Sequence, residues 1–112
     1  METTRQQKIA KQIQKDIADI FQKEGAELVR GTLVTVTAVR VSPDFGYARI
    51  YVSVFPFEQS GALLERLEEQ NRFLRRALGQ RIRNQIKNIP EIRFLVDDSL
   101  EYIAQIDRAL KG

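Results

Sequence analysis

Residues 32–55 are TLVTVTAVRVSPDFGYARIYVSVF, and this stretch determines the fold class of the chain. Its first ten and last nine residues are rich in β-branched and aromatic side chains, which favour extended strands. The segment SPDFG at 42–46 is typical of a turn, because proline presets its own φ and glycine supplies a positive φ. We therefore predict two antiparallel strands, at 32–41 and 47–55.

Apolar residues in these strands follow the period of a half-buried sheet. The second strand alternates strictly, with an apolar set at Ala48, Ile50, Val52 and Val54 and an outward set at Tyr47, Arg49, Tyr51 and Phe55. The first strand changes phase, because Val34 and Val36 are followed by Val39 and Val41. This three-residue step predicts a β-bulge near Thr37-Ala38.

Helical patterns lie on both sides of the hairpin. Residues 4–24 repeat apolar side chains at three- and four-residue steps, and Gly25 suits the stop. Downstream, Ser60 is the predicted N-cap of a helix over 61–77, and the pattern resumes after Gly79 until Pro90. Since glycine inside a helix costs about 1 kcal/mol relative to alanine, we expect a kink at Gly79 between two helices.

The last part of the chain predicts a third strand at 91–97 and a short C-terminal helix. Asp98 or Ser99 would cap that helix, and its apolar face would contain Leu100, Ile103, Ile106 and Leu110. The two-helix crossover makes the second and third strands parallel if they are neighbours. The expected fold is a two-layer α+β domain over residues 1–112, with a three-stranded mixed sheet and the order α-β-β-α-kink-α-β plus the short helix.

Composition excludes several classes of site. The chain has no cysteine and no histidine, so disulfides, thiolate nucleophiles, imidazole bases and the usual zinc sites are ruled out. The adjacent Asp97-Asp98 pair precedes the last predicted helix, where an N-cap role fits better than a metal site. We expect no catalytic residue, metal or cofactor, and hence no enzyme.

No apolar run approaches the ~20 residues that a membrane span needs. The first five residues, METTR, also lack the apolar region of a secretory signal. We therefore expect a cytoplasmic protein with no membrane partner, and a monomer.

Positive charge is segregated in one segment of the chain. Residues 72–87 contain no Asp or Glu but hold six basic side chains: Arg72, Arg75, Arg76, Arg81, Arg83 and Lys87. Helical spacing gathers the first three on one face, and an anionic partner would offset their repulsion. A kink at Ala77-Leu78-Gly79 would also point the amides of a helix beginning at Gly79-Gln80 toward a phosphate.

A second basic stripe, Arg5, Lys8, Lys11 and Lys15, lies opposite the apolar face of the first helix. Together the two stripes indicate RNA binding through phosphates, with a solvated helix face as the alternative. The outward aromatic residues of the second strand are a weaker candidate for base stacking, since such residues more often pack against neighbours.

The whole chain resembles a known family. Its element order is similar to a type II KH domain, but GxxG is absent and Ala77-Leu78-Gly79 stands at the matching position. This Ala-x-Gly form resembles bacterial ribosome-binding factor A. The same resemblance extends over RQQK at 5–8, VRVSPD at 39–44, ARIYVSV at 48–54, IPEIRF at 89–94 and DDSLEYI at 97–103.

That resemblance implies a KH-like RNA-binding domain whose partners are the free small (30S) ribosomal subunit and its 16S rRNA. It implies a role in ribosome biogenesis, in processing the 16S rRNA 5′ end and in cold adaptation. Two alternatives remain open: a general single-strand RNA-binding KH domain, and a protein-interaction module that docks by its sheet edge or aromatic face.

Overall fold

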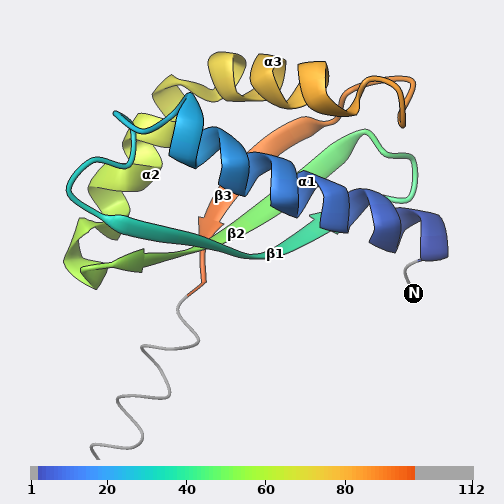
Figure 1. Cartoon of the computed structure of the whole chain (residues 1–112). Coiled ribbons are helices and arrows are strands. Elements are labelled where there is room, and N and C mark those ends of the chain that lie inside the picture. Colours follow the sequence, from blue (N-terminus) through green and yellow to red (C-terminus); the bar gives the residue numbers. More distant parts are fainter. Residues whose placement is uncertain (1–2, 98–112) are drawn as a thin grey trace, which may run out of the picture.

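A computed structural model describes residues 3–97, which form three helices and three strands in the predicted order (Figure 1). The helices are α1 (Thr4–Lys23), α2 (Ser60–Glu69) and α3 (Asn71–Ile82), and a 3-10 turn, η1 (Phe57–Gln59), precedes α2. The strands are β1 (Leu33–Val41), β2 (Tyr47–Phe55) and β3 (Glu91–Val96). The α+β class with a three-stranded mixed sheet is confirmed. The predicted last helix, from 99 to 110, lies outside the described residues.

The sheet has the order β1-β2-β3, so β1 and β3 are its edges. β1 pairs antiparallel with β2, and β2 pairs parallel with β3 across the two-helix crossover. The register shifts between Val36 and Ala38, which makes Thr37 the extra residue of a bulge and confirms the predicted phase change. Because of this bulge, Val36 and Val39 both face the core.

α1 is fixed to the sheet by polar contacts as well as by its apolar face. Thr3 and Gln6 form a capping box, and the buried Gln6 side chain also donates from Nε2 to the carbonyl of Val41 at 3.0 Å. Further along the helix, Gln14 Nε2 donates to the carbonyl of Val36 at 2.9 Å. These amides satisfy carbonyls on the open edge of β1, where unpaired groups would invite another strand.

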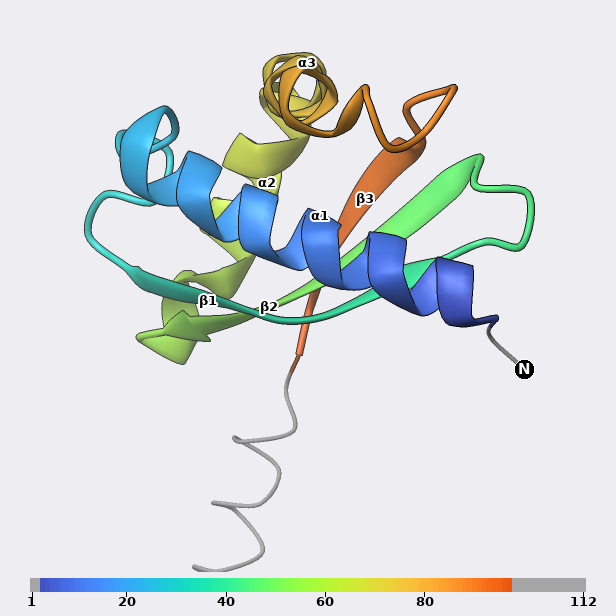
Figure 2. The same cartoon turned by 45° about the vertical axis from the view of Figure 1, so that its right-hand side comes forward.

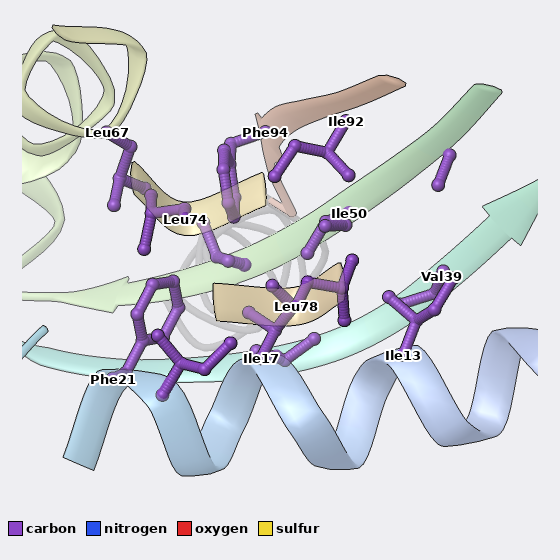
Figure 3. Packing of buried hydrophobic residues seen from close by; sticks show 14 of the residues in the cluster. Ile13, Ile17, Phe21, Val39, Ile50, Leu67, Leu74, Leu78, Ile92 and Phe94 are labelled. Atoms are coloured by element: carbon purple, nitrogen blue, oxygen red, sulfur yellow. The ribbon is translucent and has the colours of Figure 1, made fainter. Parts of the chain in front are cut away.

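The core lies between the sheet and a helical layer that covers one of its faces (Figure 2). Ile13 and Ile17 of α1 meet Leu74 and Leu78 of α3 over Ile50 of β2, and all five side chains are fully buried (Figure 3). This matches the apolar periodicity of the sequence, since each buried set occupies one face of its own element.

The kink in the crossover is real, but its predicted position at Gly79 is wrong. The two helices separate at Gln70, where φ is −104° and ψ is 18°, and Gly79 lies inside α3. α2 packs against β3 whereas α3 packs against α1, so the chain must change direction between them (Figure 1). α3 then ends at Ile82, and residues 83–90 are not the second half of a helix.

Two smaller predictions are also wrong. Ser60 is the first residue of α2 rather than its N-cap, and its hydroxyl donates to the carbonyl of Phe57 at 2.6 Å. In the turn after β1, the positive φ belongs to Phe45 at 59° rather than to Gly46. The Asp44 carboxylate accepts hydrogen bonds from the Ser42 hydroxyl and the Gly46 amide. These bonds organise the turn without a positive φ at Gly46.

Candidate nucleic-acid interface

The outer side of α3 carries the first half of the predicted basic segment. Arg72, Arg75 and Arg76 are all exposed, because Leu74 and Leu78 turn the opposite side of the helix into the core. They border a hollow of about 790 Å³ between α3 and the start of β3. Arg83 and Lys87 follow α3 and are also exposed, although no helical face joins them. Five of the six predicted basic side chains therefore reach solvent on or just beyond α3.

Although it is exposed, Arg75 forms hydrogen bonds that stabilise the fold. Its Nε donates to the carbonyl of Pro90 at 3.0 Å, and its Nη2 donates to the carbonyl of Ile89 at 2.8 Å. Asn71 adds a third link, from Nδ2 to the carbonyl of Ile92 at 3.0 Å. These bonds tie α3 to the segment that enters β3. A phosphate would have to compete with two carbonyls for the guanidinium of Arg75.

Arg81 lies apart from the other basic residues and forms ion pairs with α1 and the residue that follows it. Its Nη2 lies 2.7 Å from Glu24 Oε1 and 3.2 Å from Asp19 Oδ2, and its side chain is 21% exposed. Burial disfavours its charged form, but the hydrogen bonds that its guanidinium donates to Glu24 and Asp19 outweigh burial, so the pKa of Arg81 is raised. The hydrogen bond from Arg81, with a second from Lys23, lowers the pKa of Asp19. Arg81 thus stabilises the α1–α3 packing.

Ala77, Leu78 and Gly79 do not form an exposed bend. Ala77 and Leu78 are buried, and Gly79 is half-buried against Ile89. A Cβ on Gly79 would lie 3.2 Å from Ile89 Cγ1, so the glycine allows close packing at this point. Because α3 continues through Gly79 and Gln80, their amides do not begin a helix, and the predicted helix N-terminus for a phosphate is wrong. Gln80 itself is exposed.

The stripe on α1 is exposed as predicted, at Arg5, Lys8, Lys11 and Lys15. Lys8 and Lys11 border a hollow between α1 and β1, and the guanidinium of Arg5 lies 5.0 Å from the ring centroid of Phe45. In the structure, this stripe and the arginines of α3 do not form one continuous basic surface. The stripe lies over the β1 edge, whereas Arg72, Arg75 and Arg76 lie over the β3 edge.

Two exposed arginines, Arg40 and Arg93, were missed from the sequence. Both share a row of the sheet with Arg49, which sequence alternation had already placed outward. Alternation between apolar neighbours would have placed each of them outward as well, but only the strand register aligns the three. The pairing of Arg81 with Asp19, 62 residues away, was missed too, and no local pattern signals it.

The described residues show no sign of a metal site or of a membrane-spanning helix. Within 3–97, no group of three or more acidic side chains is arranged to hold a metal. None of the described helices is long and apolar enough to cross a membrane. The arrangement can neutralise phosphates at two edges, with little means of reading a base sequence.

Residues 5–110 match the family model of ribosome-binding factor A. The chain is similar to ribosome-binding factor A of Cytophaga hutchinsonii, with 42% identity over 110 residues that cover 98% of this chain and 83% of that protein. It is equally similar to the protein of that name from Flavobacterium psychrophilum, with 42% identity over 113 residues that cover 100% of this chain and 87% of the relative.

Solved structures give the same result for the fold. The crystal structure of ribosome-binding factor A from Thermus thermophilus is similar with a TM-score of 0.69 and 27% identity, covering 81% of this chain and 94% of that one. A homology model of the Thermus thermophilus factor, fitted into a cryo-EM map of a 30S complex, has a TM-score of 0.63 and 32% identity. It covers 79% of this chain and 90% of the other.

Proposed function

This chain belongs to the ribosome-binding factor A family, and from that premise we propose that it binds the free small ribosomal subunit as an assembly factor. The family relative from Thermus thermophilus that was fitted into a 30S complex supports this partner. The proposal also includes assistance to 16S rRNA 5′-end processing, action in the cytoplasm and a role in growth at low temperature. The chain would act as one KH-like RNA-binding domain and as a monomer.

The observation that carries the proposal is the exposed positive charge on and after α3, in a segment, 71–87, that contains no Asp or Glu. Glu68 and Glu91, from outside that segment, border the hollow beside Arg72 and Arg76. Arg72, Arg76, Arg83 and Lys87 are exposed and form no ion pair with any described residue. Arg72 and Arg76 repel each other on one face of α3, and rRNA phosphates would offset that repulsion. Arginine suits the task because its planar guanidinium can contact a phosphate with two hydrogen bonds.

The mechanism is binding without turnover. Phosphate contacts release counterions, so affinity should fall steeply with salt and depend little on base sequence. Arg5, Lys8, Lys11 and Lys15 would add a second set of phosphate contacts over the β1 edge. Because the two sets lie over opposite edges of the sheet, the domain could hold two segments of rRNA at a fixed separation.

Docking of a protein partner through a sheet edge has less support. Gln6 and Gln14 already donate to carbonyls of β1, and Asn71 donates to the carbonyl of Ile92 in β3. An added strand would have to displace these amides before it could pair.

The test replaces two exposed arginines whose side chains form no hydrogen bond or ion pair with the described residues, in the variant Arg76→Glu/Arg83→Glu. We expect its affinity for purified free 30S subunits to fall by tenfold or more, in sucrose-gradient co-sedimentation at low and moderate salt. The salt slope of log affinity should decrease by about 2, because two phosphate contacts are lost. Unchanged co-sedimentation would show that α3 is not the RNA surface.

Two controls separate binding from folding and from total charge. Lys23→Glu/Arg30→Glu makes the same charge change at side chains that are 70% and 80% exposed and lie outside the proposed interface, so it should bind nearly normally. Arg81→Gln removes the ion pairs to Asp19 and Glu24 and should lower the free energy of unfolding by about 1 kcal/mol in urea titrations. The folded Arg81→Gln protein should still bind the subunit.

A further inference from the structure

Three arginines lie in a single row across the sheet. Arg40 of β1 is paired with Arg49 of β2, and Arg49 is paired with Arg93 of β3. Directly opposed residues on neighbouring strands have Cβ atoms about 5 Å apart, so the row spans the whole width of the sheet, roughly 10 Å.

All three side chains leave the sheet on the face that the described helices do not cover. The rows on either side of the arginines are buried: Val41, Ala48 and Ile92 on one side, and Val39, Ile50 and Phe94 on the other. Since successive side chains alternate between faces, the arginine row must point away from the core. Each arginine is exposed, and Figures 1 and 2 show the described helices gathered on the opposite face.

Among the described residues, the pairing of Arg49 with Arg93 is electrostatically unfavourable. Like charges directly opposite each other destabilise a sheet, and these two guanidinium groups stand on directly paired residues. Arg49 and Arg93 form no ion pair with described residues. Glu91 is exposed on the same face, but it is paired in register with Tyr47 rather than with an arginine. An anionic partner would offset the repulsion between these guanidinium groups.

Aromatic side chains flank the central arginine. Tyr47 and Tyr51 lie two residues before and after Arg49 and therefore on the same face, with Tyr47 37% exposed and Tyr51 half-buried. Tyr47, Arg40 and Arg49 border a hollow of about 750 Å³. Positive charge interleaved with aromatic rings suits a single nucleic-acid strand, whose phosphates pair with the charges and whose bases stack on the rings.

We propose that Arg40, Arg49 and Arg93 form a phosphate-binding row for one RNA strand that crosses the sheet face left uncovered by the described helices. The proposal rests on the proposed function for its source of RNA and adds a contact surface on the opposite face of the domain. Arg40 also borders the hollow beside Lys8 and Lys11, so the row continues the α1 stripe from the β1 edge toward the β3 edge. An RNA strand on this path would run from the β1 edge to the β3 edge of the sheet, on the face opposite the helical layer.

The decisive variant is Arg49→Glu, which has opposite effects on stability and on binding. A glutamate opposite Arg93 replaces a repulsion by an attraction, so the Tm of the free protein should rise by a few degrees. Its affinity for free 30S subunits should fall about tenfold or more, because the centre of the row would repel phosphate. Arg49→Lys keeps the charge and should retain most of the affinity.

A chemical probe locates the contact. The chain has no cysteine of its own. Thr35→Cys, on the sheet face away from the described helices, and Gln80→Cys, on α3, can therefore each carry one tethered iron chelate. Both should cleave 16S rRNA in the complex, at different segments. Cleavage from position 80 alone would overturn the row as an RNA surface.

The outcomes also distinguish this inference from the proposed function. If the wild-type protein does not bind the subunit, the proposed function fails. If Arg76→Glu/Arg83→Glu loses binding while Arg49→Glu binds normally, only the arginine row fails. A fall in Tm for Arg49→Glu would mean that Arg49 is not repelled by its neighbours in the free protein, and that result would also overturn the arginine row.

Discussion

Asp16 on α1 has one satisfied and one unsatisfied carboxylate oxygen. Oδ1 accepts a hydrogen bond from Gln12 Nε2 at 3.0 Å, whereas Oδ2 is buried and has no hydrogen-bond partner among the described residues. Burial raises the pKa of Asp16 above its ordinary 3.8, although the Gln12 bond and the charge of Arg81 act against it. Its neighbour Asp19 has a lowered pKa because Arg81 and Lys23 hold its carboxylate.

These two carboxylates predict opposite effects of pH on stability. The raised pKa of Asp16 means that its stabilising contribution is present below pH 3.8 and is lost as pH rises through the folded value. Asp16→Asn removes that loss, so the variant should gain free energy of unfolding relative to wild type as pH rises from about 3 to 7. Urea titrations over this pH range would measure the difference.

Asp19→Asn is the matched control, with the opposite sign. The lowered pKa of Asp19 contributes stability above pH 3.8 that is lost as pH falls through the folded value. The Asp19→Asn variant should therefore lose stability relative to wild type over the same rise in pH. Curves that move in the same direction for both variants would contradict this assignment.

At the scale of the element, α3 is defined by what its two sides contact. Leu74 and Leu78 face the core. On the other side of the helix, Arg75 donates hydrogen bonds to the carbonyls of Ile89 and Pro90, just before β3. Gly79 lies where the helix passes closest to Ile89. A glycine that looked like a helix breaker is therefore a packing residue of an intact helix.

Two glycine substitutions test this role. Gly61→Ala in α2 meets no atom within 4 Å, so it should raise the free energy of unfolding by up to about 1 kcal/mol through helix propensity. Gly79→Ala gains the same propensity but presses on Ile89, whose carbonyl Arg75 holds, and should show little or no net gain. Thermal or urea unfolding measures both.

The larger variant Gly79→Val should lose about 1–3 kcal/mol, because its extra methyl groups cannot avoid Ile89. Adding Ile89→Ala makes room and should recover part of what Gly79→Val alone loses. Equal gains from Gly61→Ala and Gly79→Ala would refute a packing role for Gly79.

At the scale of the whole molecule, positive charge lies at the two edges of the sheet while the middle of the helical layer is neutralised. Where α1 packs on α3, Asp19 and Glu24 form ion pairs with the guanidinium of Arg81, and its charge also acts on Asp16. On the opposite face, the row through Arg49 crosses from one edge to the other. Binding through two faces would let one small domain hold separate rRNA segments.

The two faces should act independently. Combining Arg49→Glu with Arg76→Glu/Arg83→Glu changes groups that lie on opposite faces and share no partner, so the losses in log affinity should add. Binding of free 30S subunits at fixed salt, measured for the three variants, checks this. If the combined variant binds the subunit as tightly as whichever parent variant binds it less tightly, only one face touches the subunit.

The sequence by itself determined the strands, the first helix and the faces that they turn inward. Alternation in 47–55, the phase change at Thr37 and the helical repeat of 4–24 each depend on neighbours a few residues apart, and all three appear in the structure. The hairpin and the parallel crossover followed from the order of those elements. The exposure of Arg72, Arg76, Lys8 and Lys11 followed from the same periodicity.

Only the tertiary structure decided which charged residues are available to a partner. Arg81 pairs with Asp19 across 62 residues, and Arg75 binds carbonyls 14 and 15 residues away, which no local pattern contains. The break between α2 and α3 falls at Gln70 because the two helices pack on different elements, and Gly79 serves contact with Ile89. Strand register aligned Arg40, Arg49 and Arg93. Side-chain period sets the face of an element, but packing between distant elements sets the partner of each charge.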